Sequence, residues 1–99
     1  MGGLRQVIYE VIWTSQFKKS YKLAKKRGLP IRELHDIVEK LRTDTVIEQR
    51  YHDHELTGLL KGTHELHIRP DWLLCYRKTK STLTLTLVET GSHSDLFGK

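Results

Sequence analysis

Residues 64–89, HELHIRPDWLLCYRKTKSTLTLTLVE, contain three short runs that each have the composition of a β-strand. His64–Arg69, Trp72–Lys78 and Thr82–Glu89 are rich in aliphatic, aromatic and threonine side chains, which strands favour. Only Pro70-Asp71 and Thr79-Lys80-Ser81 separate them, and turns this short join antiparallel strands. The segment therefore predicts an antiparallel meander at the centre of the fold.

Alternation along these runs predicts which side chains face the core. The last run contains three leucines that alternate with threonines: Leu83, Leu85 and Leu87. A period of two is typical of a sheet with one buried face. The same period in the first run places Leu66 and Ile68 inward and leaves His67 on the outer face with Glu65 and Arg69.

The residues before the meander predict one strand and two helices. Val7–Trp13 has the β-branched and aromatic content of a strand that is covered on both faces. A basic amphipathic helix runs from an N-cap at Thr14 to Gly28, and a second helix begins at Pro30 and ends near Thr43–Asp44. The expected order is therefore β-α-α-β-β-β in a single α+β domain of all 99 residues.

Three segments show no clean period. Met1–Leu4 is expected to be disordered, and Thr90–Lys99 is too short and polar to be another core element. Thr45–Leu60 is expected to be a loop that leads into the sheet. A loop of that length in a small domain usually serves the function of the protein.

The chain is basic, with 17 lysines and arginines, 12 acidic residues and a formal net charge of +5. A basic protein favours a polyanionic partner, because each phosphate that it neutralises releases condensed counterions. Nucleic acid is the leading candidate. The other interpretations are a surface that is charged for solubility and one that binds an acidic protein.

Several classes of protein are disfavoured by the composition. No apolar run approaches the roughly 18 residues of a membrane span, and the first residues lack the apolar block of a secretory signal. Cys75 is the single cysteine, so neither an internal disulfide nor a cysteine-based zinc site can form within the chain. We therefore expect a cytoplasmic protein with no membrane partner.

Residues 52–72, HDHELTGLLKGTHELHIRPDW, hold four of the six histidines together with several carboxylates. Histidine gives and takes protons near neutral pH, so the density indicates acid–base chemistry or metal binding. His52 and His54 share a face if the segment is extended, but no HExxH helix or cysteine pair accompanies them, and we assign no metal ligand. Ser92 beside His93 lacks the strand–turn–helix context of a serine nucleophile.

What remains is a metal-free set of imidazoles, carboxylates, cations and aromatic rings, which fits cleavage of RNA by its own 2′-hydroxyl. That reaction needs a general base for the 2′ proton, a general acid for the 5′ oxygen and cations for the phosphorane charge. An aromatic ring can also hold a splayed base. We therefore expect five side chains to converge: His54, His67, Trp72, His93 and Phe97.

Three spans resemble the YafQ branch of the RelE/ParE superfamily of bacterial toxins. They are FKKSYKLAKKRG (17–28), HELTGLLKGTHELHIRPDWLLCY (54–76) and TGSHSDLFG (90–98). The likeness runs from about Val11 to Gly98, and its motif is specific. A histidine before Leu-x-Gly is followed by Lys-Gly, His-x-x-Pro-Asp-Trp and Gly-Ser-His-x-x-Leu-Phe at fixed offsets.

The resemblance implies a RelE-like α+β fold in which two helices pack on a small twisted antiparallel sheet. It also implies an mRNA endoribonuclease that depends on the ribosome. Because the chemistry expected of the residues themselves is metal-free, we expect no cofactor. The implied partners are ribosomal RNA, mRNA and a cognate antitoxin that neutralises the toxin.

The active-site residues of the family fall on six positions of this chain: His54, His67, Asp71, Trp72, His93 and Phe97. Of these, His93 is expected to be the general acid and His54 or His67 the general base. Asp71 would orient a neighbouring imidazole or bind the ribose. The two aromatic rings would position the target nucleotide.

The chain departs from the family at Glu89, where the best-known relative has an arginine just before Thr-Gly. One expected cation is therefore missing. Phosphate stabilisation is expected either to come from Lys61, Arg69 or Arg77 or to be weaker than in the relative. Two other functions stay open. A gyrase-poisoning toxin of the ParE type would not need the histidines, and a catalytically inactive relative would only bind RNA or antitoxin.

Overall fold

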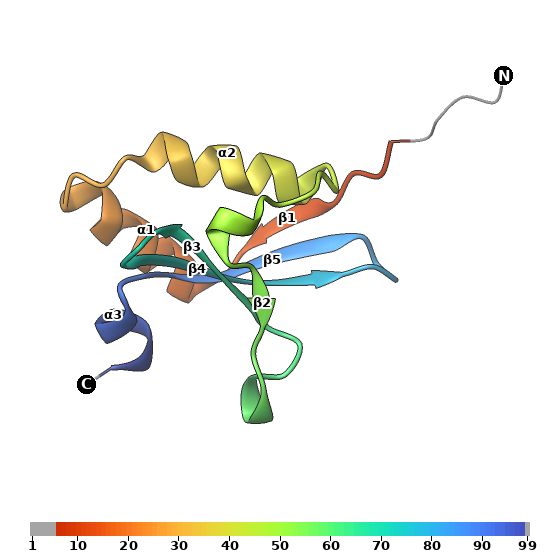
Figure 1. The fold of residues 1–99 in the computed structure, drawn as a ribbon. Coiled ribbons are helices and arrows are strands. Elements are labelled where there is room, and N and C mark those ends of the chain that lie inside the picture. Colours follow the sequence, from red (N-terminus) through yellow and green to blue (C-terminus); the bar gives the residue numbers. More distant parts are fainter. Residues whose placement is uncertain (1–5, 99) are drawn as a thin grey trace, which may run out of the picture.

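Two helices cover one face of a five-stranded sheet in the computed structural model, which describes residues 6–98 (Figure 1). The elements are β1 Glu10–Trp13, α1 Ser15–Lys26, α2 Ile31–Arg42, η1 Gln49–Tyr51, β2 His54–Glu55, η2 Gly58–Leu60, β3 His64–Arg69, β4 Trp72–Thr79, β5 Thr84–Gly91 and α3 His93–Phe97, where η marks a 3-10 turn. No helix in this part of the chain is long and apolar enough to cross a membrane.

The predicted meander forms the middle of the sheet. β3 pairs antiparallel with β4, and β4 pairs antiparallel with β5, as expected from the sequence. β1 joins the other side of β5 in parallel, with Glu10 opposite Thr84, and β2 forms the opposite edge, so the order is β1-β5-β4-β3-β2. The sheet is therefore mixed rather than wholly antiparallel, because the two helices and the meander supply the long connection that a parallel pair requires.

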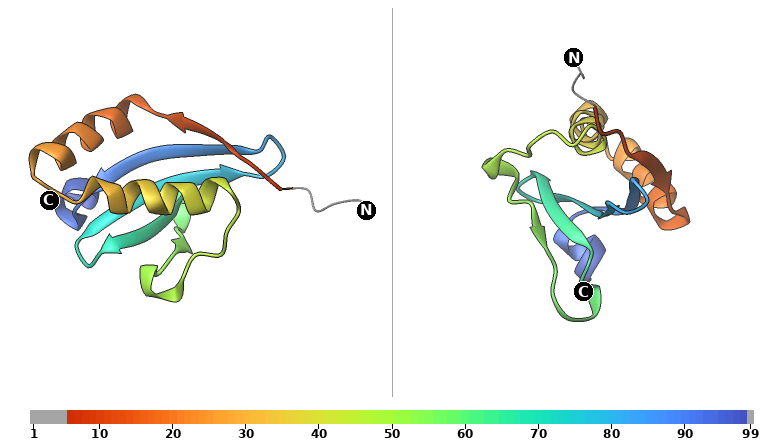
Figure 2. Two further views of the ribbon diagram at one scale, coloured as in Figure 1. Left: turned by 90° about the horizontal axis from the view of Figure 1, so that it is seen from above. Right: turned by 90° about the vertical axis from the view of Figure 1, so that its right-hand side faces the viewer.

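α1 and α2 lie on the same side of the sheet and provide much of its core (Figure 2). Thr14 begins α1 as an N-cap, because its hydroxyl accepts the backbone N–H of Phe17 at 3.0 Å. Gly28 follows α1 with a φ of 78°, a conformation that glycine adopts without strain. The fully buried members of the core cluster are Phe17, Leu34, Ile37, Leu66, Trp72, Leu74, Tyr76, Leu85 and Leu87.

Two strands begin later than predicted. The run Val7–Trp13 is a strand only over Glu10–Trp13, and Ile12 is 43% exposed, because the helices cover only one face of this edge strand. The last strand begins at Thr84, two residues later than expected. Leu83 lies in the preceding turn with a φ of 49° and a 41% exposed side chain, so its predicted inward position is wrong.

Segments predicted to be irregular contribute four short elements. Thr45–Leu60 contains η1, η2 and β2, in which His54 pairs with Glu65 of β3. The first two residues of Thr90–Lys99 are buried at the end of β5, and α3 follows them. Figure 1 shows α3 and the segment beyond β2 on the side of the sheet opposite to α2. Met1–Leu4, expected to be disordered, lies outside the described residues.

The register of β5 can be tested by unfolding. Leu87→Ala should lower the free energy of unfolding by about 2–5 kcal/mol, because it removes a fully buried side chain. Leu83→Asn should change that free energy by about 0.5 kcal/mol or less, since Leu83 is exposed and asparagine tolerates a positive φ. Urea titration measures both values, and equally large losses would contradict the assigned register.

Candidate active site

The face of the sheet that α1 and α2 leave open carries most of the candidate residues. On β3, Glu65 and His67 point away from the buried Leu66 and Ile68, because side chains alternate along a strand. β2 runs beside β3 and brings His54 next to Glu65. α3 and the segment after β2 project from this side of the sheet and flank its open face (Figure 2).

Glu65 lies at the centre of a cluster of imidazoles. One of its carboxylate oxygens is 3.4 Å from Nε2 of His54 and 3.9 Å from Nε2 of His67. The ring centroid of His67 is 5.5 Å from that of His93 and 5.6 Å from that of His52. The structure thus gathers four histidines from β2, β3, α3 and the loop before β2 around one carboxylate. We call these five residues the histidine cluster.

The backbone determines which nitrogen of His54 carries a proton. Nδ1 of His54 lies 2.7 Å from the carbonyl oxygen of His52, and a carbonyl oxygen only accepts, so Nδ1 is the donor. Nε2 then has the lone pair in the neutral ring, and this atom faces Glu65. His54 therefore presents Nε2, and not Nδ1, as its free ring nitrogen.

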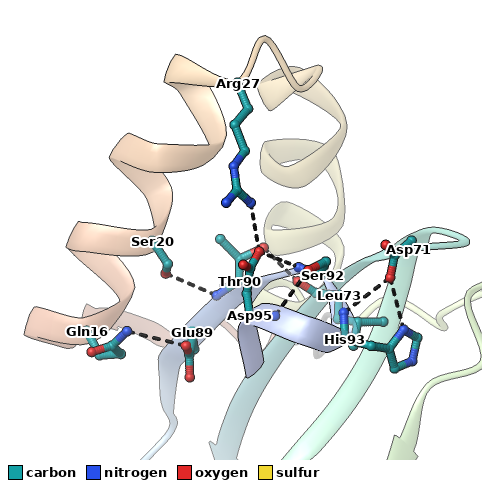
Figure 3. Close-up of polar contacts among 10 residues, drawn as sticks. All are labelled: Gln16, Ser20, Arg27, Asp71, Leu73, Glu89, Thr90, Ser92, His93 and Asp95. Atoms are coloured by element: carbon teal, nitrogen blue, oxygen red, sulfur yellow. Dashed lines mark hydrogen bonds and ion pairs between the residues drawn. The ribbon is translucent and has the colours of Figure 1, made fainter. Parts of the chain in front are cut away.

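Asp71 holds His93 from the turn between β3 and β4 (Figure 3). One of its carboxylate oxygens accepts the backbone N–H of His93 at 3.2 Å and ring Nδ1 of the same residue at 3.1 Å. The backbone bond, followed by the ring bond, holds the pKa of Asp71 below its ordinary value. Since Nδ1 is bonded to Asp71, Nε2 of His93 is the ring atom left for a substrate.

Two of the three expected phosphate-binding cations lie on the open side of the sheet. Cys75 is the strand partner of Glu65 and lies on the same face of the sheet. Arg77 is two residues after Cys75 along β4, so its side chain is also on the face that carries Glu65. Its guanidinium donates to the hydroxyl of Thr63 at 2.8 Å. Lys61 is exposed just after η2, beyond the paired residues of β2 and β3.

Arg69 is not placed with the others. A register shift interrupts the pairing between His67 and Arg69, so the alternation predicted for β3 is lost there. The guanidinium of Arg69 instead donates to both carboxylate oxygens of Glu33 in α2, at 2.7 and 2.6 Å. The expectation that Arg69 lies on the outer face with His67 is therefore wrong, and its donors are used between the sheet and a helix.

The two aromatic residues have different surroundings. Trp72 is only 2% exposed and belongs to the core cluster with Leu74 and Tyr76, which alternate with it along β4. Its indole N–H is buried with no hydrogen-bond partner among residues 6–98. Trp72 offers no free ring face to a nucleotide, which corrects its expected role in substrate binding. Phe97 is 49% exposed at the end of α3, so its ring is open to stacking.

Glu89 occupies the position where the resemblance predicts an arginine. Its carboxylate faces α1 and accepts a hydrogen bond from the side-chain amide of Gln16 at 3.3 Å. Partial burial raises the pKa of Glu89. This position therefore contributes a contact to α1 and no positive charge to a phosphate.

Three members of the histidine cluster form a set that could hold a metal ion. The ligand atoms of Glu65, His67 and His93 all lie within 4.8 Å of one another. Two imidazole nitrogens and a carboxylate suit late first-row ions such as Zn²⁺. The sequence pattern offered only His52 and His54 as ligands, because His93 on α3 is far along the chain from Glu65 and His67 on β3.

Glu65 is the site residue that the sequence analysis did not single out. It was expected on a solvent-facing surface, but it is only 6% exposed, with His54 and His67 beside its carboxylate. Its position two residues before His67 was the available signal, since residues at that spacing share one face of a strand.

Comparison with known proteins gives a family and several relatives. A family model described as the bacterial toxin YafQ of a type II toxin–antitoxin system matches residues 9–98. The mRNA interferase toxin YafQ of Escherichia coli K12 is 34% identical over 90 residues, which are 90% of this chain and 96% of the relative. The E. coli DinJ–YafQ complex aligns with a TM-score of 0.85 at 32% identity, over 93% of this chain and 100% of that chain. A metal-bound toxin from Helicobacter pylori aligns with a TM-score of 0.84 at 38% identity, over 91% and 99%.

These likenesses extend over nearly all of the described residues and include the strands, the helices and the segments that form the histidine cluster. The family model covers most of the chain, and the identity to the E. coli toxin exceeds what a shared fold alone requires. The chain belongs to the YafQ toxin family of type II toxin–antitoxin systems, within the RelE/ParE superfamily.

Proposed function

We propose that the protein is an endoribonuclease that cleaves mRNA on the ribosome and thereby inhibits translation. The observation that carries the proposal is the histidine cluster, in which His54, His67 and His93 surround a buried carboxylate on an open face of the sheet. The similarity of the chain to the E. coli mRNA interferase toxin supports the same activity.

The cluster contains a base and an acid for attack by the 2′-hydroxyl of the RNA. Nε2 of His54 has a lone pair in the neutral ring, so this atom would accept the 2′ proton. Asp71 would stabilise a protonated His93, whose Nε2–H can then be given to the departing 5′ oxygen. His67 lies near the same carboxylate oxygen of Glu65 as His54 and beside the ring of His93, and it is the alternative base.

Positive charge and an aromatic ring complete the proposed site. Arg77 and the exposed Lys61 are the cations of the open side, and they would hold the phosphate as its charge increases. The exposed ring of Phe97 would stack on the target base. In this scheme no step requires a metal ion, and an ion on the cluster would compete with the proton transfers for the same imidazole nitrogens.

α1 supplies a surface for the ribosome. Five of its lysines are exposed on the side away from the core: Lys18, Lys19, Lys22, Lys25 and Lys26. The first turn of α1 contains no acidic residue that would weaken this charge. We propose that this lysine surface docks on ribosomal RNA, because clustered cations release counterions from a polyanion.

A cognate antitoxin is the second proposed partner. The support is the complex of the related E. coli toxin YafQ with the antitoxin DinJ. An acidic segment of such an antitoxin would compete with RNA phosphate for Arg77 and Lys61.

The chemistry predicts the dependence on the nucleophile. Replacing the target ribose by its 2′-methoxy form should stop cleavage, because no 2′ proton can be removed, and the upstream product should carry a 2′,3′-cyclic or 3′-phosphate. Activity should persist in EDTA on ribosomes kept intact by other means. Mass spectrometry identifies the end group of the upstream product. A 3′-hydroxyl end would indicate that a metal-activated water, and not the 2′-hydroxyl, is the nucleophile.

His93→Gln should lower the single-turnover rate on the order of 10²–10⁴-fold, because it removes the proposed acid. Ribosome affinity should stay nearly unchanged. His35→Gln is the matched control, since His35 is exposed on α2 and bonds Tyr21 of α1 at 2.6 Å, outside the histidine cluster. Equal rates for the two variants would argue against His93 as the acid.

Reversing two charges of the lysine surface should weaken ribosome binding. Lys19→Glu with Lys22→Glu should reduce affinity in sedimentation assays and flatten its dependence on salt, because fewer counterions are released. Arg32→Glu with Lys80→Glu changes the net charge by the same amount at exposed positions elsewhere. Equal losses for both pairs would show that only net charge matters.

A further inference from the structure

α3 carries two residues of the proposed site but is too short to hold its own position. It spans five residues, His93–Phe97, and helices shorter than about 12–15 residues are marginal without tertiary packing. Leu96 is partly buried, whereas Phe97 is exposed. Contacts outside the helix must therefore set where His93 and Phe97 lie relative to the sheet.

Asp95 joins the beginning of α3 to the end of α1. Within α3, the backbone N–H of Ser92 donates to Oδ2 of Asp95 at 2.9 Å, and the N–H of Asp95 donates to the hydroxyl of Ser92 at 3.1 Å, which is a capping box. The same Oδ2 accepts from the guanidinium of Arg27 at 2.7 Å (Figure 3). One carboxylate therefore caps α3 and binds it to α1.

The ion pair between Arg27 and Asp95 lies at the surface of the protein. The side chains of Arg27 and Asp95 are 48% and 29% exposed, and exposed ion pairs contribute little to overall stability. The main effect of the pair is therefore expected in the orientation of α3.

Arg27 continues a polar stripe on α1. Gln16, Ser20 and Arg27 are separated by four and seven residues, a spacing that places them on one face of a helix. The amide of Gln16 donates to Glu89, and the hydroxyl of Ser20 accepts the backbone N–H of Thr90 at 3.1 Å (Figure 3). Along this stripe, Gln16 and Ser20 therefore contact the end of β5, and Arg27 contacts α3.

The contact between α3 and the end of β5 is close. A Cβ atom at Gly91 would lie 2.9 Å from both Cβ and Oδ2 of Asp95 and 3.0 Å from a methyl carbon of Leu96. Glycine at this position lets α3 lie directly against the strand. Since α3 cannot move further inward, loosening it would displace His93 outward.

We propose that Arg27 and Asp95 are positioning residues of the proposed ribonuclease, whose ion pair ties α3 to α1 and thereby holds His93 against Asp71 and Phe97 over the open face. The expected effect of this ion pair on kcat rests on the proposed function. Its effect on the position of α3 can be tested without RNA.

An arginine near an RNA site can also act by binding phosphate, and variants of both partners separate the two roles. If the pair positions α3, Arg27→Gln and Asp95→Asn should each lower kcat by about 10- to 100-fold, as misplaced catalytic groups do, with KM changed by about twofold or less. The double variant should be no worse than either single variant, because both remove one interaction. If Arg27 binds RNA, only Arg27→Gln should impair the enzyme, through KM, and this result would overturn the proposal.

Two further variants give a rescue and a control. Arg27→Lys should recover part of the lost kcat, because a lysine can still pair with Asp95 through a single donor. Arg42→Gln should leave kcat unchanged, although it too removes an arginine from the end of a helix and breaks an ion pair, with Glu39 of the same helix. A similar loss in Arg42→Gln would point to a general effect on stability and overturn the proposal.

The titration of Asp71 reports on α3 without a substrate. The bonds from His93 lower the pKa of Asp71, so releasing α3 should move that pKa up toward its ordinary value. Carboxyl ¹³C NMR should show this shift in Arg27→Gln and Asp95→Asn but not in Arg42→Gln, and the amide of His93 should exchange faster in the first two variants.

An unchanged Asp71 titration together with unchanged amide exchange of α3 in Arg27→Gln and Asp95→Asn would overturn the positioning role. If the wild-type protein does not cleave mRNA on ribosomes, the proposed function is wrong. The titration and exchange would still decide whether Arg27 and Asp95 position His93.

Discussion

A carboxylate removed from water must be compensated by cations or donors, and this constraint organises the open face of the sheet around Glu65. The side chain is almost fully buried, and the groups beside its oxygen are the imidazoles of His54 and His67. The pairing of β2 with β3 places one of them there. The same surroundings raise the pKa of the Cys75 thiol to about 12, mainly by burial and then by the charge of Glu65. The floor of the site is thus poor in water, and electrostatic interactions above it are strengthened.

The sheet separates residues that maintain the fold from residues that are open to a substrate. On the helix side, Arg69 binds Glu33 of α2 and Trp72 fills the core. On the open side, the histidine cluster, Arg77 and Phe97 remain accessible in different degrees. Two residues that the family resemblance and the charge pattern assign to RNA binding therefore serve the packing of the sheet and helices. Trp72 can influence the site only through the strand that it anchors.

Patterns with a regular period predicted the fold well, and features that depend on distant contacts did not follow from them. The turns at Pro70-Asp71 and Thr79–Ser81 gave the correct antiparallel meander, because local chemistry determines such connections. The period of β3 failed at Arg69, where a register shift breaks the alternation. The short apolar run of β1 does not reveal that β1 pairs in parallel with β5, because the relative direction of two strands depends on the whole chain between them. Likewise, the position of α3 and the burial of Glu65 depend on contacts with other elements, although the capping box that begins α3 is local in sequence.

The parallel pairing of β1 with β5 also determines when a growing chain can complete its sheet. Glu10 and Thr84 are neighbours in space, but a ribosome must add all the residues between them first, which takes on the order of several seconds. Contacts at such long sequence separation also form slowly, because the entropy of closing the loop is lost before the contact is gained. His93 and α3 follow β5 directly, so the histidine cluster cannot exist before that strand has been made. If the histidine cluster is the active site, as proposed, the nascent chain is inactive until nearly all of it has been synthesised.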